Sequence, residues 1–356
     1  MSLAVEIAQA LVRIPSVNPH YDPASDGEGG AVRWIERWAR WHGIESRIDE
    51  VLPGRSNIIL SVNNGAEHPH FLMAGHTDTV AVDGMEVAPF GGEISNGRLS
   101  GRGSADMKGP LAAMLAALLT LRDQRERWRG SATVACVVDE EYQARGIKAL
   151  MARPDSRFSY AVVGEPTRMS VVRGCKGCLR FSFDAVGASA HSSTPDLGRN
   201  AIVAMSEAIL ALNTYFHTQL NKEYKLGFGS ATGSIGLIRG GSGINIVPET
   251  CRASVDIRLV PGQRWEAIYA QIKACVENRV ALVPGVSWKF DEAPFTDPSF
   301  ETAEGDFLVR TSLGILGQRQ AEVVAYSCDA SKIAAAGVPT IILGPGDIAR
   351  AHTSTE

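Results

Sequence analysis

The sequence predicts an α/β protein. A main domain, built on a central and mostly parallel sheet flanked by helices, carries an inserted α+β domain. Three observations lead to this prediction. The chain has 356 residues, more than one ordinary compact core accommodates. Several short runs are continuously apolar and β-branched, which is typical of buried parallel strands. Between about residues 176 and 293 the pattern changes to strands of alternating polarity interleaved with helices.

We therefore assign residues 1–175 and 294–356 to the main domain and residues 176–293 to the insertion. In the main domain, apolar runs predict strands over residues 57–62, 71–74, 131–138, 160–163 and 338–343. Helices are predicted over residues 3–13, 31–41 and 111–121. Trp34, Trp38 and Trp41 recur at helical spacing in the second of these helices, so we expect this stripe to pack into the core.

The insertion is predicted to be a compact, ferredoxin-like α+β domain. Its strands are expected over residues 179–186, 234–238, 251–259 and 286–290, and its helices over residues 201–212 and 265–280. This gives the order strand–helix–strand–strand–helix–strand, a known compact arrangement. No internal repeat is present, which excludes a solenoid.

Composition excludes several classes of partner. Hydrophobic residues make up 45% and charged residues 21% of the chain, and the formal net charge is -4 without any Lys/Arg block. We therefore expect neither nucleic acid nor a membrane as a partner. The N-terminal stretch lacks a cationic start and a cleavage site. It is expected to be an amphipathic helix ending near Ile14 and Pro15, and not a signal peptide.

The six cysteines are scattered, which in a chain of this length indicates free thiols in a reducing compartment and predicts a cytoplasmic protein. Cys175 and Cys178 form a CxxC pattern. That pattern leads into an alternating strand, and no second cysteine pair accompanies it. We therefore expect neither a redox site nor a structural zinc site there.

Potential metal ligands follow several of the predicted strands in the main domain. In open α/β sheets, sites form outside the carboxyl ends of the strands. Imidazole and carboxylate groups are good ligands for zinc-like ions. Any one of these residues alone could be a helix cap or a surface charge, but their recurrence at strand ends predicts a shared site. The candidates are His76, Asp106, Glu140, Glu141, Glu165 and His352.

Asp78 is expected to support this site without binding metal. In an extended segment it lies on the same side of the chain as His76, two residues earlier. Its carboxylate could then accept the second imidazole N–H and fix the tautomer of His76.

Taken together, the motifs resemble the M20 metallopeptidase family, which includes acetylornithine deacetylase, succinyl-diaminopimelate desuccinylase, aminoacylase and bacterial carboxypeptidase relatives. The resemblance runs through nearly the whole chain in the family's order. It rests on GHTDTV, GRGSADMKG, DEE, GEPT, AHSSTPDLGRNA, GGSGINIVP and the terminal GPG…AH. The sequence departs from the family's pattern at CKGC. It also ends at Glu356, where the family usually continues with a closing helix.

The resemblance implies an amidohydrolase with two metal ions per subunit, usually zinc, with cobalt as a possible substitute. Asp106 would bridge the two ions. His76 and Glu165 would complete one metal position, and Glu141 and His352 the other. Two such ions can share a water and lower its pKa.

Glu140 would then be the general base. It would accept a proton as the water attacks the amide carbon, and it would later deliver a proton to the leaving nitrogen. Adjacent residues of an extended chain point in different directions. Glu140 and Glu141 can therefore hold separate roles.

In the insertion, the resemblance makes His191 an oxyanion stabiliser that reaches the active site of the partner subunit in a homodimer formed through this domain. Its alternative role is a cap near the helix that starts by Arg199. Asn245 and Arg258 would hold the substrate's carboxylate, although Arg258 could instead form a salt bridge with Asp256.

Gly344 and Gly346 of the GPG motif are likewise assigned to substrate binding. The run YSCDASKIAAAGVPTIILGPG is more similar to the deacetylase branch than to the desuccinylase branch. The predicted substrate is therefore an N-acyl amino acid such as acetylornithine, in amino-acid biosynthesis.

Three alternatives accompany this prediction. A dipeptidase or carboxypeptidase, or a succinyl-diaminopimelate desuccinylase, would use the same chemistry on another small substrate. A non-catalytic homologue that binds an acyl amino acid or a metal belongs to another class. Glu140 argues against that class, because a binding protein does not need a base beside the metal.

Overall fold

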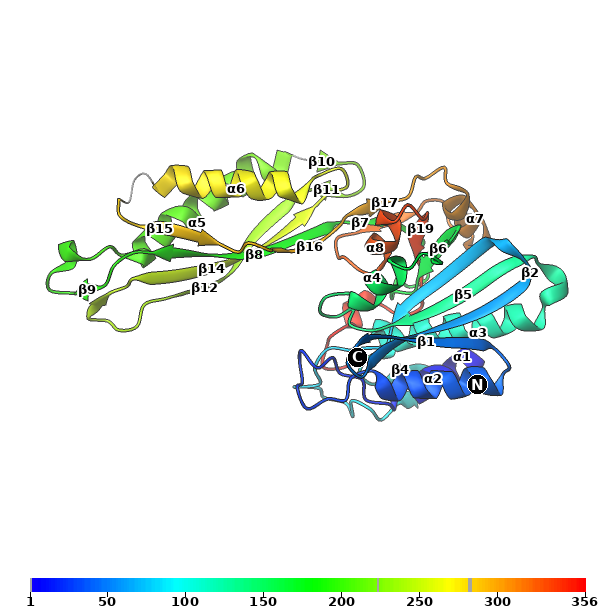
Figure 1. The fold of residues 1–356 in the computed structure, drawn as a ribbon. Helices are drawn as coiled ribbons and strands as arrows, with labels where there is room; N and C mark the ends of the chain where they lie inside the picture. The colour runs from blue at the N-terminus through cyan, green and yellow to red at the C-terminus, as the bar shows by residue number, and fades with distance from the viewer. Residues whose placement is uncertain (1, 223, 281–283) are drawn as a thin grey trace. The chain divides into compact units, whose positions relative to one another are not determined.

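The computed structural model describes residues 2–222, 224–280 and 284–356, which form two compact units (Figure 1). The main unit comprises the chain up to Gly174, Glu301–Glu322 and Cys328–Glu356. The inserted unit comprises Cys175–Phe300 and Val323–Ser327. It extends past residue 293, where we placed the end of the insertion, because β16 (Phe295–Asp297) pairs with β8 (Gly177–Val186) of the same sheet.

The main sheet has eight strands in the order β1-β2-β6-β19-β7-β17, with β5 paired to β2 and β18 paired to β7. The strands are β1 (Glu45–Leu52), β2 (Arg55–His76), β5 (Gly130–Val137), β6 (Tyr160–Val163), β7 (Val172–Cys175), β17 (Phe300–Glu301), β18 (Glu322–Val324) and β19 (Thr340–Ile342). The central pairs β2/β6 and β6/β19 are parallel. Strands β1 and β7 add antiparallel pairs to β2 and β19. The predicted α/β class with a mostly parallel central sheet and an inserted α+β domain is confirmed.

One strand, β2, replaces the two strands that we predicted over residues 57–62 and 71–74. Along the first half of β2, the residue numbers of its partners on β5 decrease, from Cys136 opposite Ile58 to Gly130 opposite Asn64. Along the second half they increase, from Ser131 opposite His70 to Val137 opposite His76. The chain therefore passes along β5 twice, in opposite directions. The apolar runs were found correctly, but the polar residues between them continue the strand through its bend.

Helices cover the sheet and supply most of the main core. They are α1 (Leu3–Val12), α2 (Gly29–Trp41), α3 (Gly109–Asp123), α4 (Arg145–Met151), α7 (Phe307–Leu316) and α8 (Ala330–Ala335). Helices α1, α2 and α3 share one apolar core with β2 and β5, in which Leu11, Ile35 and Leu115 are fully or almost fully buried. Helix α3 packs its leucines against the sheet that carries the candidate site, so it holds the strand ends in place.

The tryptophan stripe of α2 is only partly in the core. Trp34 and Trp38 pack against it, but Trp41 is 86% exposed, so the expectation for Trp41 was wrong. The inward face of the helix is formed by Ala31, Val32, Ile35 and Ala39. Trp34 and Trp38 lie beside this face, whereas Trp41, the last residue of the helix, lies outside the core.

In the inserted unit, the principal elements are β8, α5 (Ala201–Thr218), β12 (Thr232–Gly240), β14 (Thr250–Leu259), α6 (Trp265–Val280) and β15 (Ser287–Phe290). The sheet order is β12-β14-β8-β15, with every pair antiparallel. This is the predicted ferredoxin-like order. Both helices pack on the same side of the sheet around Phe181, Phe183 and Leu212 (Figure 1).

Short strand pairs complete the fold. They are β3 (Glu93–Ser95) with β4 (Arg98–Ser100), β9 (Ala190–His191) with β13 (Ile246–Val247), and β10 (Tyr224–Lys225) with β11 (Gly229–Ser230). Across the three described ranges, no helix combines the length and the apolar character needed to span a bilayer.

Candidate functional site

The candidate ligands lie at one edge of the main sheet because parallel strands end there. Strand β2 ends at His76 itself, and β5 ends at Val137, two residues before Asp139. Strand β6 ends at Val163, shortly before Glu165, and β19 leads to the segment that carries His352. The second half of β2 runs parallel to β6, and β6 runs parallel to β19. Their carboxyl ends therefore meet at the same edge of the sheet.

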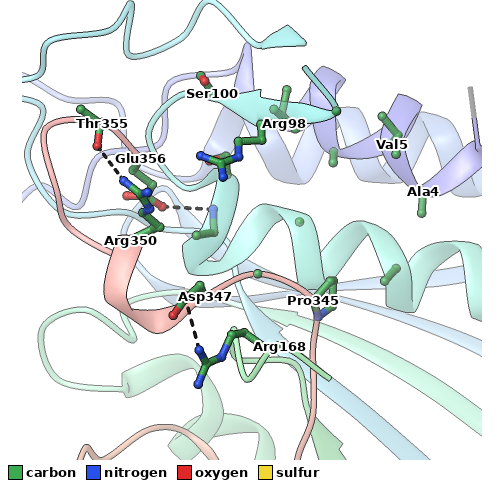
Figure 2. Close-up of a pocket in the computed structure, with 18 of the residues that line it drawn as sticks. Ala4, Val5, Arg98, Ser100, Arg168, Pro345, Asp347, Arg350, Thr355 and Glu356 are labelled. Atoms are coloured by element: carbon green, nitrogen blue, oxygen red, sulfur yellow. Dashed lines mark hydrogen bonds and ion pairs between the residues drawn. The ribbon is translucent and has the colours of Figure 1, made fainter. Parts of the chain in front are cut away.

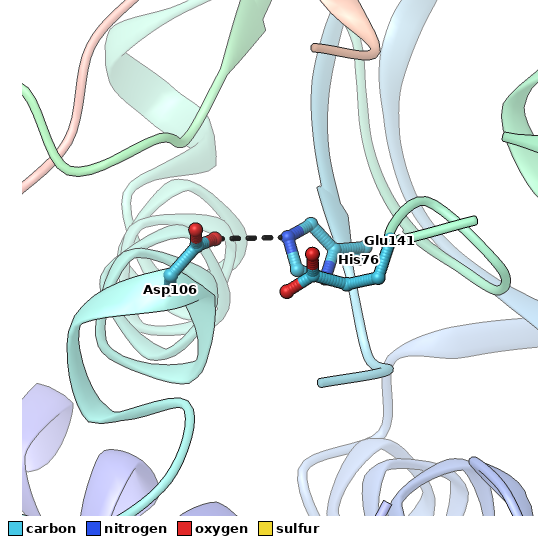
Figure 3. A group of neighbouring side chains, drawn as sticks. All are labelled: His76, Asp106 and Glu141. Carbon is cyan, nitrogen blue, oxygen red and sulfur yellow. Dashed lines mark hydrogen bonds and ion pairs between the residues drawn. The ribbon is translucent and has the colours of Figure 1, made fainter. Parts of the chain in front are cut away.

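Asp106 lies between two imidazoles. Its Oδ1 is 3.0 Å from Nε2 of His76, and its Oδ2 is 3.3 Å from Nε2 of His352. Nε2 of His352 is also 3.0 Å from Oε1 of Glu141. One ligand atom from each of His76, Asp106 and Glu141 lies within 4.8 Å of the others, and Figure 3 shows these side chains facing one another. Each carboxylate oxygen of Asp106 thus faces an imidazole, and its role as a bridging ligand stays a prediction.

Glu140 and Glu165 lie beside this cluster. Oε2 of Glu140 is 4.0 Å from Nε2 of His76, and Glu165 is buried. Burial raises the pKa of Glu140 well above its usual value. The charge of His76 opposes this shift, and nearby Asp329 adds to it. Burial likewise raises the pKa of Glu165, and the charge of Asp106 raises it further. A buried acid, Glu165, and a half-buried one, Glu140, both with raised pKa values, are thus placed next to the imidazole–carboxylate cluster.

His76 is oriented by the segment that follows it. Its Nδ1 is 2.9 Å from the main-chain oxygen of Asp78 and 3.5 Å from Oδ1 of the same residue. The nearer acceptor is thus the main-chain oxygen, whereas we expected the carboxylate. Burial lowers the pKa of His76, but hydrogen bonds to Asp106 and Asp78 outweigh burial and hold that pKa well above its usual value. With Nδ1 occupied, Nε2 is the nitrogen that faces the cluster.

The carboxylate of Asp78 has a different task. Its Oδ1 accepts the main-chain N–H of Glu140, and its Oδ2 accepts that of Glu141, each at 3.1 Å. Asp78 therefore fixes the backbone of both glutamates at once. Burial raises the pKa of Asp78, but His76 and Asn18 outweigh burial and hold it below the usual value.

The donor set fits a pair of divalent cations. Carboxylates outnumber imidazoles in this cluster. Their negative charges repel one another, and the pKa values of Glu140 and Glu165 are already raised. Cations would relieve this repulsion. Carboxylate oxygen and imidazole nitrogen are ligands that zinc accepts. Ligand atoms of His76, Asp106 and Glu141 lie close enough together to share an ion, and Nε2 of His352 is within 3.3 Å of the last two. Glu165 as a ligand stays a prediction.

Residues outside the candidate ligand set fix the loop that carries Asp106. The side chain of Glu356 accepts the main-chain N–H groups of Ala105 at 3.2 Å and Asp106 at 3.0 Å, and it pairs with Arg102. Lys108 is buried and donates to the main-chain oxygen of Ile14 at 2.8 Å. Burial lowers the pKa of Lys108 to about 7. These contacts fix the loop without involving any predicted ligand side chain.

A cavity of about 1070 Å³ lies against the same loop, in the main unit. Residues of α1, Arg98, Arg168 and Arg350 line it, together with Ser104 and Ala105 (Figure 2). Arg168 faces Asp347 across 3.9 Å, and Arg350 reaches Thr355.

The two glycines that we assigned to substrate binding have structural reasons to be glycine. A Cβ on Gly344 would lie 2.5 Å from the main-chain oxygen of Glu165, so only glycine fits against that segment. Gly346 has a φ of +94° and lines the cavity beside α1. Their role in substrate binding stays a prediction.

His191 and Asn245 are neighbours in the inserted unit. His191 ends β9, where it pairs with Ile246 of β13, and Ser192 N–H donates to the main-chain oxygen of Asn245 at 3.0 Å. The main-chain N–H of Ser193 donates to Nδ1 of His191 at 3.1 Å. Nδ1 is therefore an acceptor, which leaves the N–H of the neutral ring on Nε2. His191 is exposed, so this donor is available at the surface.

Arg258 forms the salt bridge that we considered as its alternative role. Its Nε is 2.8 Å from Oδ1 of Asp256, and Nε of Arg180 is 2.6 Å from Oδ2 of the same carboxylate. Asp256 thus holds two arginines on the β8/β14 pair. A role of Arg258 in holding a substrate carboxylate stays a prediction.

A family model described as Peptidase family M20/M25/M40 matches residues 72–356. The chain belongs to this peptidase family. The matched residues include every candidate ligand, and the family resemblance drawn from the motifs is confirmed. M20 family members are metal-dependent hydrolases, which agrees with the donor set at the edge of the main sheet.

Curated relatives share the full length of this M20 chain. An acetylornithine deacetylase of Aliivibrio fischeri (strain MJ11) is 28% identical over 357 residues, covering 98% of this chain and 91% of the relative. One from Photorhabdus laumondii is 30% identical over 360 residues, covering 99% of this chain and 91% of the relative.

Solved structures share the fold. A tripeptidase from Staphylococcus aureus has a TM-score of 0.79 at 22% identity and covers 99% of this chain and 92% of its own. A dinuclear metal-binding peptidase of the M20 family from Bacillus subtilis has a TM-score of 0.74 at 16% identity, covering 99% and 91%.

Sequence reasoning missed several residues around the M20 site. Asp329 is buried, and its charge raises the pKa of both Glu140 and Glu165. It directly precedes α8, so in the sequence it is indistinguishable from an ordinary helix cap. Asn18 and Glu356 were also missed, because their contacts join segments far apart in the chain. The buried thiol of Cys178 in the CxxC pattern lies near Asp256 and is not in a disulfide.

Proposed function

We propose that this chain is a dinuclear amidohydrolase that removes the acyl group from an N-acyl amino acid, with acetylornithine or a similar N-acetylated amino acid as its substrate. The observation that carries this proposal is Glu140. A half-buried carboxylate lies 4.0 Å from an imidazole of a donor set suited to metal ions. The curated relatives named acetylornithine deacetylase support the choice of substrate.

Five residues would hold two zinc ions, with cobalt as a substitute. Asp106 would bridge them, His76 and Glu165 would complete one position, and Glu141 and His352 the other. When bound, the ions supply Lewis-acid polarisation of the amide carbonyl and a lowered pKa for the attacking water.

Glu140 moves the proton. Its carboxylate accepts a proton from the water that attacks the amide carbon, and it then donates that proton to the departing nitrogen. The hydrogen bond from its main-chain N–H to Asp78 keeps the side chain on the side of His76.

The inserted unit would supply the contacts to the rest of the substrate. His191 would stabilise the oxyanion through Nε2–H, which its bond from Ser193 N–H leaves as the donating side. Asn245 and Arg258 would hold the carboxylate of the amino acid, with Gly344 and Gly346 of the main unit also lining the substrate site. In this role Arg258 would divide its guanidinium between substrate and Asp256.

We also propose a homodimer formed through the inserted unit, in which His191 serves the partner's site. Strand β12 lies at an edge of its sheet, and Leu237 and Ile238 on it are more than half exposed. Leu210 on the adjacent helix α5 is also exposed. An exposed apolar edge strand is a ready surface for pairing with another chain.

Light scattering after size exclusion tests the dimer. Leu237→Asp should shift the mass from dimer to monomer, whereas Leu226→Asp, at another exposed leucine of the same unit, should leave it unchanged. A monomeric wild type at micromolar concentration would contradict the proposal.

A cytoplasmic location in amino-acid biosynthesis completes the proposal. Cys136, Cys178 and Cys251 are buried thiols outside any disulfide, as expected in a reducing compartment.

Peptide hydrolysis is the second candidate, because the same chemistry cleaves a peptide bond. The fold neighbour from Staphylococcus aureus is named a tripeptidase. The two candidates differ in the group on the acyl side of the bond, so one assay panel separates them.

The test is an amine-release assay on protein reconstituted with Zn²⁺ or Co²⁺. The panel contains N-acetylornithine, other N-acetyl amino acids, N-succinyl-diaminopimelate, dipeptides and tripeptides. We expect the highest kcat/KM on an N-acetyl amino acid and about two metal ions per subunit by elemental analysis. Cleavage of peptides alone would move the assignment to a peptidase, and metal binding without turnover of any substrate would favour the non-catalytic homologue.

A further inference from the structure

Asn18 is fully buried between two carboxylates that follow different strands of the main sheet. Its side-chain Nδ2 donates to Oδ2 of Asp78 at 2.8 Å and to Oδ1 of Asp139 at 3.1 Å. Asp78 follows β2, and Asp139 follows β5. One amide therefore connects the ends of the two strands that deliver His76 and the Glu140–Glu141 pair.

The amide has one orientation. Its Oδ1 accepts the main-chain N–H of His20 at 3.0 Å, so the NH₂ group must face the carboxylates. The backbone is fixed as well: the N–H of Asn18 donates to the oxygen of Thr79 at 2.9 Å, and the N–H of Thr79 donates to the oxygen of Ser16 at 3.0 Å. The donor is thus held in place before any ligand binds.

Both carboxylates that Asn18 contacts control the segment carrying the base. Asp78 accepts the main-chain N–H of Glu140 and of Glu141. Asp139 has a φ of +66°, in the left-handed region that a non-glycine residue adopts only when its surroundings hold it there. The direction in which Glu140 leaves the strand depends on this turn.

Asp139 also contacts a buried ion pair. Arg55 bonds Glu28 through two nitrogens, at 2.5 and 2.7 Å, and its Nη1 is 3.2 Å from Oδ1 of Asp139. Glu28 in turn accepts the main-chain N–H of Asp139 at 3.1 Å. Arg145 also bonds Asp139, through Nε at 2.5 Å from Oδ2 and Nη2 at 3.1 Å from Oδ1, so two arginines hold this carboxylate. On the side of Asp78, the amide of Asn18 is the donor placed between two like charges.

We propose that Asn18 is a positioning residue. By donating to both Asp78 and Asp139, it holds Glu140 and Glu141 in register with His76. Without this donor, two buried carboxylates each lose a hydrogen bond and the link between them is broken, so the segment that they fix relaxes. Groups that orient metal ligands typically change metal affinity or activity 10–100-fold when they are removed. The inference about turnover rests on the proposed function, whereas the inference about metal affinity does not.

Asn18→Leu tests the proposal, because leucine is close in size and lacks the donor. We expect zinc affinity to fall roughly tenfold or more in a competition titration. At saturating zinc, kcat should fall about 10–100-fold while KM stays within about threefold. The matched control is Asn64→Leu, at the bend of β2 far along the strand from His76. It also loses side-chain hydrogen bonds, to Arg125 and Trp128, but none that reaches the site.

The control should lower the melting temperature and leave zinc affinity and kcat within about twofold of wild type. If Asn18→Leu behaved in the same way, Asn18 would be a structural residue only, and the proposal would be wrong. If the leucine variant fails to fold, Asn18→Ser replaces it. Its single hydroxyl can satisfy one carboxylate at most, so a several-fold loss of zinc affinity is expected, and wild-type affinity would overturn the proposal. If the wild type cleaves no substrate in the panel, the proposed function fails, but the zinc titration still decides on Asn18.

Discussion

The two units hold their predicted functional side chains in opposite ways. In the main unit, His76 and Asp106 are buried, and each makes several bonds to other groups of the site. In the inserted unit, His191 is exposed and its imidazole is bonded only to Ser193, two residues away, among the contacts of the described chain. Metal ligands must be held rigidly in position before the ion binds. A donor that acts at another surface needs only a fixed tautomer.

This difference separates two kinds of sensitivity to mutation. A residue of the main site shares its partners with several others, so its loss is transmitted to them. The loss of an exposed side chain such as His191 should remove one interaction and leave the rest intact. The three predictions below test this contrast, beginning with the largest effect.

Glu140→Gln should give the largest loss of turnover. The amide keeps the shape of the side chain but cannot accept the proton, so kcat should fall about 10²–10⁴-fold. Metal content should not change, because Glu140 is not among the proposed ligands. The measurement is steady-state kinetics together with elemental analysis. Glu126→Gln, at an exposed position, is the control and should match wild type. A Glu140→Gln enzyme with the wild-type rate would refute the assigned base.

His191→Ala should lower kcat about 10²-fold, the effect of removing one oxyanion donor. Because the side chain is exposed, metal content and melting temperature should stay at the wild-type level. Ser193→Ala is the matched control. It removes the hydroxyl 2.8 Å from Nδ1 but keeps the main-chain N–H that fixes the tautomer, so its effect should be below about tenfold. The alternative role of His191 as a cap was wrong, because Asn200 caps α5, so wild-type turnover in His191→Ala would leave the side chain without a role in the reaction.

The smallest expected effect is a change of stability with pH in the metal-free protein. Hydrogen bonds to Asp106 and Glu141 raise the pKa of His352 to about 10, from about 6.5 in an unfolded chain. A group whose pKa is raised by folding stabilises the folded state fully below its unfolded pKa. That contribution is lost as pH rises through the folded pKa. The stabilisation from His352 should therefore be complete near pH 6 and absent above pH 10.

The measurement is the melting temperature of metal-free wild type and His352→Gln across this range, because the difference cancels the other titrating groups. The difference should be largest near pH 6 and should shrink towards pH 10. His217→Gln, at an exposed histidine of α5, serves as the control. A difference that does not vary with pH would show that the contacts of His352 do not depend on its charge.

The sequence alone was sufficient to predict the candidate site residues that directly follow an apolar run. Apolar runs end where the candidate site residues begin, so the sequence alone places His76, Glu165 and the Glu140–Glu141 pair at one sheet edge. Local pattern could not reveal the second passage of β2 along β5, because its bend is polar. It could not reveal the exposure of Trp41 either, because helical spacing does not show how far the core extends along α2, and Trp41 is its last residue.

The supporting contacts of the site were beyond sequence reasoning for a related reason. Asn18, Arg55 and Asp139 lie in three different segments, and each has the features of a loop, strand or surface residue in its own segment. Only the folded chain brings Asn18 to 3.1 Å and Arg55 to 3.2 Å from Oδ1 of Asp139. Arg258 shows a different limit of reasoning from the sequence. Its partner Asp256 was visible two residues away, but the second arginine on the same carboxylate, Arg180, comes from a different strand.

Gly344 has a practical consequence for attempts to redesign this protein. A single methyl group there would lie 2.5 Å from the main chain of Glu165 and 2.6 Å from that of Gly164. Even alanine would push a proposed zinc ligand out of place, so a mutant library that varies this position would return inactive clones for every acyl chain offered. Enlarging or narrowing the pocket for a new acyl group has to begin at other walls.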